Sequence, residues 1–128
     1  MKLYLAHNFF ARDWLPIVVS MLEEQGHTCT SSWIYDDAHT NGGLKRDSAV
    51  IDLIDIDRSD CLVFFTEQSG PTPGQGKYFE LGYAHAKGMK IILVGTEDRC
   101  VFYFLPGMKR VSTVTELLKL VQPERVNA

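Results

Sequence analysis

Long hydrophobic segments are missing from this sequence, and its apolar runs are too short to cross a membrane. The N-terminal run, residues 1–6, is also too short for a signal peptide. Positive charge is scarce, because 13 lysines and arginines stand against 16 acids, which disfavours binding to nucleic acid polymers or anionic membranes. The three cysteines lie far apart and lack metal-ligand spacing. We therefore expect reduced thiols, a cytoplasmic protein, and no metal or cofactor.

The chain does contain alternating strand and helix patterns, over a length that suits a single domain, residues 1–128. Short apolar segments predict strands at 2–6, 27–31, 60–66, 90–95 and, at an edge, 109–112. Helical spacing predicts helices at about 12–25, 45–58, from 77 onward, and 113–121. Residues 33–43 are expected to form a loop, and residues 101–105 a strand or a loop.

Strands that alternate with helices favour an α/β fold with a parallel sheet and right-handed crossovers. The simplest solution is a doubly wound five-stranded sheet in the flavodoxin-like order 2-1-3-4-5, with helices on both faces. In that order the carboxyl ends of the first and third strands lie beside the loop that contains Gly74.

The predicted helices have apolar positions that we expect to face the sheet. For the first helix these are Trp14, Ile17, Val18, Leu22 and Met21, and for the second Val50, Ile51, Ile54 and Ile56. For a third helix starting near Lys77, the same spacing selects Phe79, Gly82, Tyr83 and Ala86, with Gly82 allowing a close approach to a strand.

The segment 74–88 is the most distinctive, because a glycine-rich turn leads directly into a helix with an early carboxylate, Glu80. In the first turn of a helix, unpaired N–H groups keep such a carboxylate ionised unless burial outweighs them. Glu80 could simply complement the helix dipole. However, the preceding loop, residues 69–76, is long and follows a strong strand, and Gly74 and Gly76 permit a ligand to approach the backbone. We therefore place a ligand site here.

Three polar side chains are predicted to converge on this site: Tyr4, Asp60 and Glu80. Two carboxylates and a phenol suit glycosidic chemistry, since one carboxylate can attack an anomeric carbon while a second acid helps the departing base accept a proton. Each has a structural alternative. Tyr4 can be an ordinary core residue, and Asp60 can cap the start of its strand.

Further residues are candidates for binding the substrate. His7 is a possible acid or base in the loop after the first strand, where Phe9 and Phe10 could stack on a base or simply cover the first helix. Lys77 would reach a phosphate together with the helix N-terminus, or would be a solvated surface residue.

These residues resemble the nucleoside 2-deoxyribosyltransferases and the related deoxynucleotide N-glycosidases. The resemblance rests on Tyr4-Leu5-Ala6 with Asn8-Phe9-Phe10, on Ser59-Asp60-Cys61-Leu62-Val63, and above all on Glu80-Leu81-Gly82-Tyr83-Ala84 followed by Gly88. The chain is also similar to small phage and prophage members, which carry a Gly-Gly-basic stretch before the glutamate, here Gln75-Gly76-Lys77.

The resemblance implies that Glu80 is the nucleophile at C1′ of a 2-deoxyribosyl group, that Tyr4 orients it, and that Asp60 contacts the base. It also implies a homodimer or larger homo-oligomer in which a neighbour completes each pocket. One departure concerns Gly74, because several transferases have an aspartate there and some hydrolases a serine.

The sequence thus predicts an enzyme that cleaves or exchanges the N-glycosidic bond of 2-deoxynucleosides or their 5′-monophosphates. Transfer to another base and hydrolysis by water both remain open. The alternative is a non-catalytic module that binds a nucleotide on the same fold, and the departure at Gly74 favours it. A flavodoxin-like or receiver-like function is disfavoured, because the acid cluster and the phosphate-binding Ser/Thr loop expected after the first strand are missing.

Overall fold

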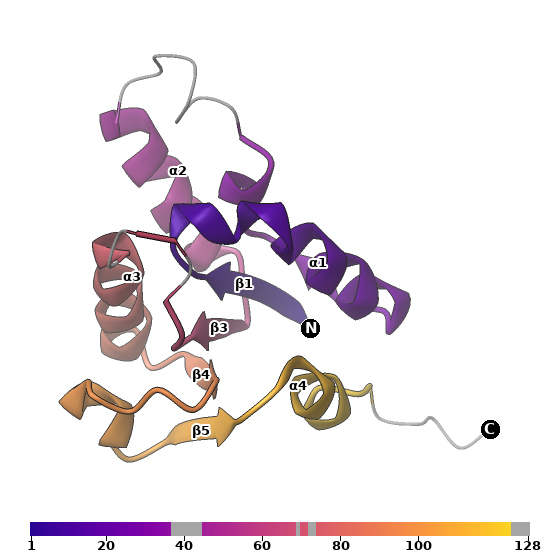
Figure 1. Ribbon diagram of the computed structural model, residues 1–128. Helices are drawn as coiled ribbons and strands as arrows, with labels where there is room; N and C mark the ends of the chain where they lie inside the picture. The colour runs from indigo at the N-terminus through magenta and orange to yellow at the C-terminus, as the bar shows by residue number, and fades with distance from the viewer. Residues whose placement is uncertain (37–44, 69, 72–73, 124–128) are drawn as a thin grey trace.

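The five strands of the computed structural model form one parallel sheet in the order β2-β1-β3-β4-β5, which confirms the predicted topology (Figure 1). The structure describes residues 1–36, 45–68, 70–71 and 74–123. The strands are β1 (Lys2–Ala6), β2 (Thr28–Cys29), β3 (Cys61–Phe65), β4 (Lys90–Val94) and β5 (Met108–Val111). β5 pairs only with β4 among the described strands and is therefore the expected edge.

Helices cover both faces of this sheet (Figure 1). They are α1 (Leu15–Glu24), α2 (Lys45–Asp57), α3 (Gln75–Ala86) and α4 (Val114–Leu120), with short 3-10 helices η1 (Phe9–Asp13), η2 (Ser32–Ile34) and η4 (Val101–Phe104). α1 contacts α4 on one face, whereas α2 contacts α3 on the other. Across the described ranges, no helix has the length and apolar character that a membrane crossing requires.

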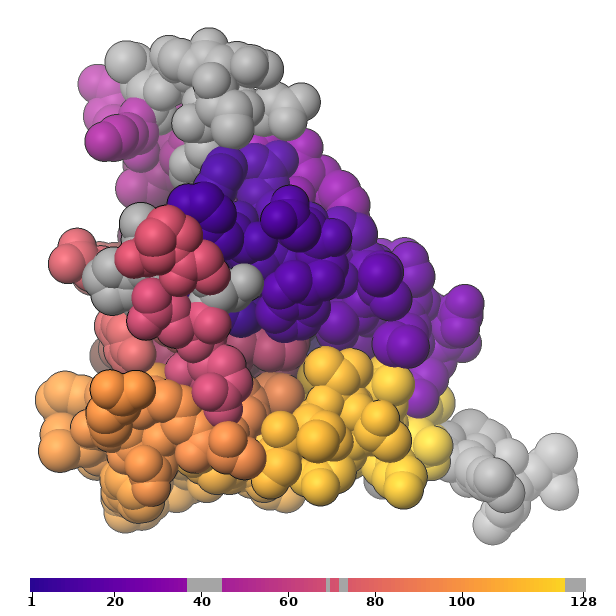
Figure 2. Space-filling model, viewed as in Figure 1, coloured from indigo at the N-terminus to yellow at the C-terminus, as the bar shows by residue number. Residues whose placement is uncertain are grey.

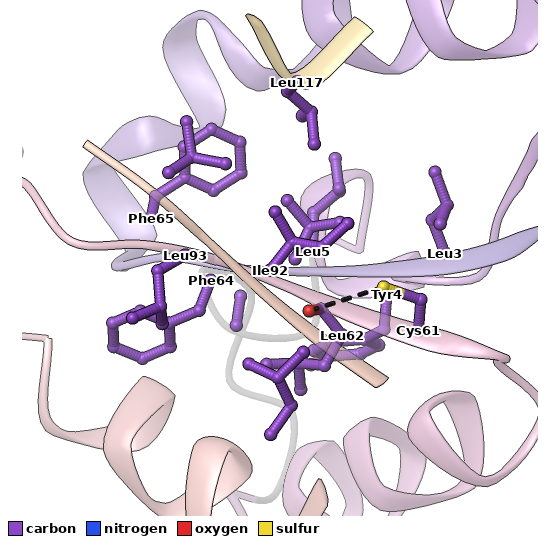
Figure 3. Packing of buried hydrophobic residues seen from close by; sticks show 14 of the residues in the cluster. Leu3, Tyr4, Leu5, Cys61, Leu62, Phe64, Phe65, Ile92, Leu93 and Leu117 are labelled. Atoms are coloured by element: carbon purple, nitrogen blue, oxygen red, sulfur yellow. Dashed lines mark hydrogen bonds between the residues drawn. The ribbon is translucent and has the colours of Figure 1, made fainter. Parts of the chain in front are cut away.

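The apolar run of β3 is buried along its whole length, because helices lie on both sides of it. Side chains alternate across the sheet, so Leu5 and Phe65 lie on the side of Leu117 from α4, and Leu62 and Phe64 lie on the other side (Figure 3). The side chain of Tyr4 lies on the same face of the sheet as Leu62 and Phe64, and this face is covered by α2 and α3. The sequence therefore places one phenol among the apolar residues of that face.

The predicted inward face of α2 is wrong. Of the predicted residues only Ile56 is buried; Val50, Ile51 and Ile54 are exposed, and Ser48 and Asp55 are buried instead. The buried carboxylate of Asp55 has hydrogen-bond partners, because its Oδ2 accepts hydrogen bonds from the backbone N (3.0 Å) and Oγ (2.5 Å) of Ser32 in η2. Hydrogen bonding to a neighbouring element thus fixes the orientation of α2 against its apolar pattern.

The remaining differences are smaller. In α1, Ile17 and Met21 are exposed and the buried residues are Leu15, Val18, Val19 and Leu22. The 3-10 helix η1 occupies the predicted first turn. The segment expected as strand or loop at 101–105 contains η4. Of the predicted loop 33–43, the start belongs to η2 and residues 37–43 lie outside the described residues.

Candidate active site

Tyr4 and Glu80 meet beneath the first turns of α3, as the sequence predicted. Tyr4 lies in β1 and is fully buried, and its hydroxyl donates a hydrogen bond of 2.6 Å to Glu80 Oε2. Burial, followed by the negative charge of Glu80, raises the pKa of Tyr4 above its ordinary value of 10.0, so the phenol keeps its proton. Tyr4 is therefore a fixed donor to one carboxylate oxygen.

Burial governs the protonation of Glu80. It raises the pKa of the Glu80 carboxyl from 4.5 to about 8; the hydrogen bond from Tyr4 lowers it, and the negative charge of Asp52 raises it further. Burial thus outweighs the helix N-terminus, which is the exception that the sequence analysis allowed for. α3 starts at Gln75, so Glu80 lies beyond its first turn, where the dipole acts weakly.

The buried face of α3 differs from the predicted one. Lys77, Glu80, Leu81 and Ala84 face inward, whereas Phe79 is 67% exposed and a Cβ added at Gly82 would meet no neighbouring element within 4 Å. A shift of two residues turns a helix by about 200°, so the predicted face is almost opposite to the real one. The prediction followed the spacing of the apolar residues and selected the wrong face, because two of the four inward positions carry charged side chains.

Gly74 has the conformation that the predicted turn requires. Its φ of 68° lies in the left-handed region, and a Cβ at this position would come within 2.5 Å of Asn8 Cβ. This close approach sets the start of α3 against the residues that follow β1. Two polar residues of the same loop that could replace the contact missing at Gly74, Ser69 and Thr72, fall outside the described residues.

A cavity of about 440 Å³ opens between the segment that follows β1, the 3-10 helix η2 and the helices α2 and α3. It is lined by His7, Asn8, Phe9, Trp33, Asp52, Gly74, Gln75, Gly76, Lys77 and Glu80. Of the nine predicted site residues, six line this cavity, and a seventh, Tyr4, is hydrogen-bonded to Glu80 in the lining. The carboxyl of Glu80, held by Tyr4, is thus accessible to a small molecule.

Asp60 is not brought to this cavity. Its Oδ2 accepts a hydrogen bond of 2.8 Å from the backbone N of Lys2, and its side chain is exposed. Asp60 precedes β3, and in a parallel sheet the residues before a strand lie at the edge opposite to the loops that leave it. The geometry therefore supports the structural alternative for Asp60, in which its side chain caps the start of the strands.

The second carboxyl in the cavity is Asp52 of α2, which the sequence analysis missed. Burial, and then the negative charges of Asp55 and Asp36, raise the pKa of Asp52 from 3.8 to about 7. Asp52 lies among exposed isoleucines and valines in an acid-rich helix. The apolar spacing of that helix therefore did not indicate that Asp52 faces the cavity. Only the orientation of α2 identifies it.

His7 lies in the cavity wall as a neutral ring. It stacks on Phe65 with ring centroids 5.3 Å apart and meets Trp14 edge-on. Burial, and then the positive charge of Lys77, lower its pKa to about 4. Its Nδ1 accepts the N–H of Asn8 at 2.7 Å, so the ring proton resides on Nε2.

The two phenylalanines after β1 have different positions. Phe9 lines the cavity, and the guanidinium of Arg12 lies 4.8 Å from the centre of its ring. Phe10 is outside the lining and lies against Gly70, where a Cβ would come within 2.4 Å of its ring. Only Phe9 is thus placed to stack on a ligand in this cavity.

Lys77 is buried, contrary to the alternative of a solvated lysine. Its Nζ donates a hydrogen bond of 2.7 Å to the carbonyl oxygen of Phe65 and lies 4.9 Å from the centre of the Phe64 ring. Burial lowers its pKa to about 8, against the opposing charges of Glu97 and Glu67. Lys77 also borders a second cavity of about 620 Å³ on the other side of α3.

Known proteins resemble this chain in structure. A 2-deoxyribosyltransferase from Bacillus psychrosaccharolyticus matches with a TM-score of 0.68 and 20% identity, over 92% of this chain and 90% of that chain. A CMP N-glycosidase from Clostridium botulinum matches with a TM-score of 0.66 and 19% identity, over 94% and 97%. A conserved protein from Enterococcus faecalis V583 matches with a TM-score of 0.66 and 18% identity, over 93% and 95%.

No protein-family model matches the sequence, and no curated protein matches it. Since the structural matches have 20% identity or less, they bear on the fold. The chain therefore has the fold of a 2-deoxyribosyltransferase and of a CMP N-glycosidase, with its buried glutamate and tyrosine at the carboxyl edge of the sheet.

Proposed function

We propose that this protein cleaves or exchanges the N-glycosidic bond of 2-deoxynucleosides or their 5′-monophosphates. The observation that carries the proposal is the buried Glu80, held by the hydroxyl of Tyr4 at 2.6 Å and facing an open cavity. A carboxylate fixed in this way can attack a sugar carbon of a molecule bound in the cavity. The two structural neighbours named for reactions of nucleosides or nucleotides support the same class of substrate.

In the first step, an oxygen of ionised Glu80 forms an ester bond to C1′ as the bond from C1′ to the base nitrogen breaks. The electron pair of that bond leaves with the base, which takes up a proton. In the second step, a nitrogen of another base or the oxygen of water attacks C1′ and loses its proton. The ester bond breaks as this new bond to C1′ forms, and the Glu80 carboxylate is restored. Tyr4 orients the carboxylate in both steps.

A non-catalytic nucleotide-binding module is the second candidate. The observation in its favour is that the pKa of Glu80 is raised to about 8, which favours the neutral carboxylic acid at pH 7. A neutral carboxylic acid is a poor nucleophile. Gly74 also offers no side chain to a base, where several members of the family resembled have an acid or a hydroxyl.

Release of free base distinguishes the two candidates. Chromatography of reactions with a panel of 2-deoxynucleosides and their 5′-monophosphates, with and without an acceptor base, should show release by the native chain. Glu80→Gln should lose about 10³-fold or more of that rate, since the nucleophile is removed. Glu24→Gln, the same change on the exposed side of α1, serves as the matched control.

Dependence on the acceptor base separates transfer from hydrolysis. Tight binding of one substrate without release, unchanged in Glu80→Gln, would instead establish the binding module. Lys77 stays a proposed contact for a 5′-phosphate, because it lines the cavity and belongs to the first turn of α3.

The homo-oligomer implied by the resemblance also stays a proposal. Its support is η4, where Val101, Phe102 and Phe104 are exposed while Tyr103 is buried against Phe64. This segment belongs to the orange part of the surface in Figure 2. Sedimentation of the purified chain tests whether copies associate.

A further inference from the structure

Two ring N–H groups belong to the described lining of the 440 Å³ cavity, and only one of them has an acceptor among the described residues. The indole of Trp33 donates its N–H to the carbonyl oxygen of Leu5 at 2.9 Å. The imidazole of His7 accepts the backbone N–H of Asn8 at Nδ1, and no described residue accepts a hydrogen bond from its Nε2. Trp33 is thus bonded within the protein, whereas His7 keeps a donor for another partner.

The proton of the neutral His7 ring is on Nε2. A backbone N–H can only donate, so the nitrogen that accepts it at 2.7 Å, Nδ1, carries a lone pair. A proton on both nitrogens would break this hydrogen bond. Burial, and then the positive charge of Lys77, also oppose a second proton by lowering the pKa of His7 to about 4. At neutral pH the side chain is therefore an uncharged hydrogen-bond donor, rather than the acid or base that the sequence suggested.

The ring of His7 is held in one orientation. It stacks on Phe65 with 14° between the ring planes, and it meets Trp14 edge-on with ring centroids 5.3 Å apart. The side chain is only 7% exposed, but Nε2 is not one of the polar atoms that are buried without a partner in the described part of the chain. Since His7 lines the cavity, a ligand there meets a donor whose direction is already set.

The surroundings of His7 favour a base as the partner of this donor. Phe9, two residues further along the same segment, is the ring placed to stack on a base. An uncharged donor suits an uncharged oxygen, whereas a phosphate calls for a cation, which the described lining provides in Lys77. Resting on the proposed function, we infer that His7 recognises the base by donating its Nε2–H to a carbonyl oxygen.

This contact selects among bases. A carbonyl oxygen accepts the hydrogen bond, whereas an amino group at the same position is itself a donor and leaves the imidazole N–H without a partner. The preferred substrates are then the nucleosides or nucleotides of keto bases, such as hypoxanthine and uracil, over those of the amino bases adenine and cytosine.

Matched pairs of substrates test the inference. 2′-Deoxyinosine and 2′-deoxyadenosine differ in the carbonyl or amino group at position 6, and 2′-deoxyuridine and 2′-deoxycytidine differ in the same way at position 4. We expect His7→Phe, which keeps an aromatic ring against Phe65, to lose about 10- to 100-fold in kcat/KM on the keto member and less than about threefold on the amino member. Because the two bases also differ as leaving groups, the measurement is the change in their ratio. The same pairs are compared as 5′-monophosphates.

Two more variants separate recognition of the base from a structural role. His7→Gln keeps an uncharged N–H donor at the end of the side chain and should recover part of the preference for the keto member. His85→Phe makes the aromatic change on the exposed side of α3 and should leave all rates unchanged. A purely structural role for His7 would lower both rates of a pair equally and leave their ratio constant.

Binding gives the same comparison without turnover. Titration calorimetry of Glu80→Gln, with and without His7→Phe, should show about 10-fold or more weaker binding of 2′-deoxyinosine and little change for 2′-deoxyadenosine. If the native chain releases no base but this difference in binding is found, the proposed catalysis is overturned and the recognition by His7 stands.

Equal effects on the two members of each pair would overturn the role of His7, while Glu80-dependent release left the proposed function standing. A loss confined to the 5′-monophosphates, and equal for keto and amino bases, would assign the donor to a phosphate oxygen and would also overturn base recognition. Neither release nor binding of any nucleoside or monophosphate would overturn both proposals.

Discussion

The two faces of the sheet are built on opposite patterns. On the face of α1 and α4, apolar residues such as Leu5, Phe65 and Leu117 are buried against one another (Figure 3). On the face of α2 and α3, the helices bury Asp55, Lys77 and Glu80 and expose several of their large apolar residues. The first face follows the hydrophobic rule, and the second departs from it at the candidate active site. Such departures are expected where function competes with stability.

The largest expected effect on stability is on the apolar face. Leu117→Ala removes a fully buried side chain from α4 and should lower the free energy of unfolding by about 2–5 kcal/mol. Leu120→Ala, on the exposed side of the same helix, should cost less than about 1 kcal/mol. Urea unfolding measures both. Similar losses in the two variants would break the contrast between the faces.

On the polar face, the effect of a substitution should depend on pH. Because the pKa of Glu80 is raised from 4.5 to about 8, the folded state keeps a proton that the unfolded chain loses, and the native chain is destabilised as pH rises through this range. Glu80→Gln removes this titration. It should therefore gain stability relative to the native chain between pH 5 and pH 9, on the order of a few kcal/mol.

Urea unfolding at the two pH values measures this gain, with Glu24→Gln as the control that should show no such dependence. A difference between Glu80→Gln and the native chain that stays constant from pH 5 to pH 9 would mean that Glu80 ionises as easily in the folded as in the unfolded state.

The smallest effect on stability is expected for the apolar residues of α3 that are exposed to solvent. Phe79→Ser should change the free energy of unfolding by less than about 0.5 kcal/mol, because the ring is largely exposed. Leu81→Ser, two positions further on the buried side of α3, should be severely destabilising. A loss above about 1 kcal/mol for Phe79→Ser would show that the ring is covered in solution.

The same contrast explains what the sequence could predict. The strands, their order and the position of α4 follow from apolar runs and periods, and Tyr4 and Glu80 could be paired because the topology sets β1 beside α3. The orientation of α3 could not be predicted, since its inward positions include Lys77 and Glu80. Apolar spacing instead selected the exposed Phe79.

Asp52 and Asp60 show the limit most clearly. Both are acids near β3 in the sequence, and nothing in their local pattern tells which one reaches the cavity. Asp60 precedes β3, so the direction of the strand places it at the amino edge of the sheet, away from the cavity. The hydrogen bonds between Asp55 and Ser32 help to orient α2, which carries Asp52 to the cavity, and such tertiary contacts have no signature in a single sequence.

Lys77 has a consequence for how the pocket could change during evolution. Its side chain borders both the 440 Å³ and the 620 Å³ cavities, and its ammonium group is held by one hydrogen bond to a backbone carbonyl. The backbone partner places no demand on any other side chain. We therefore expect a shorter residue at this single position to enlarge both spaces, while the hydrogen bond between Tyr4 and Glu80, which does not involve Lys77, is kept.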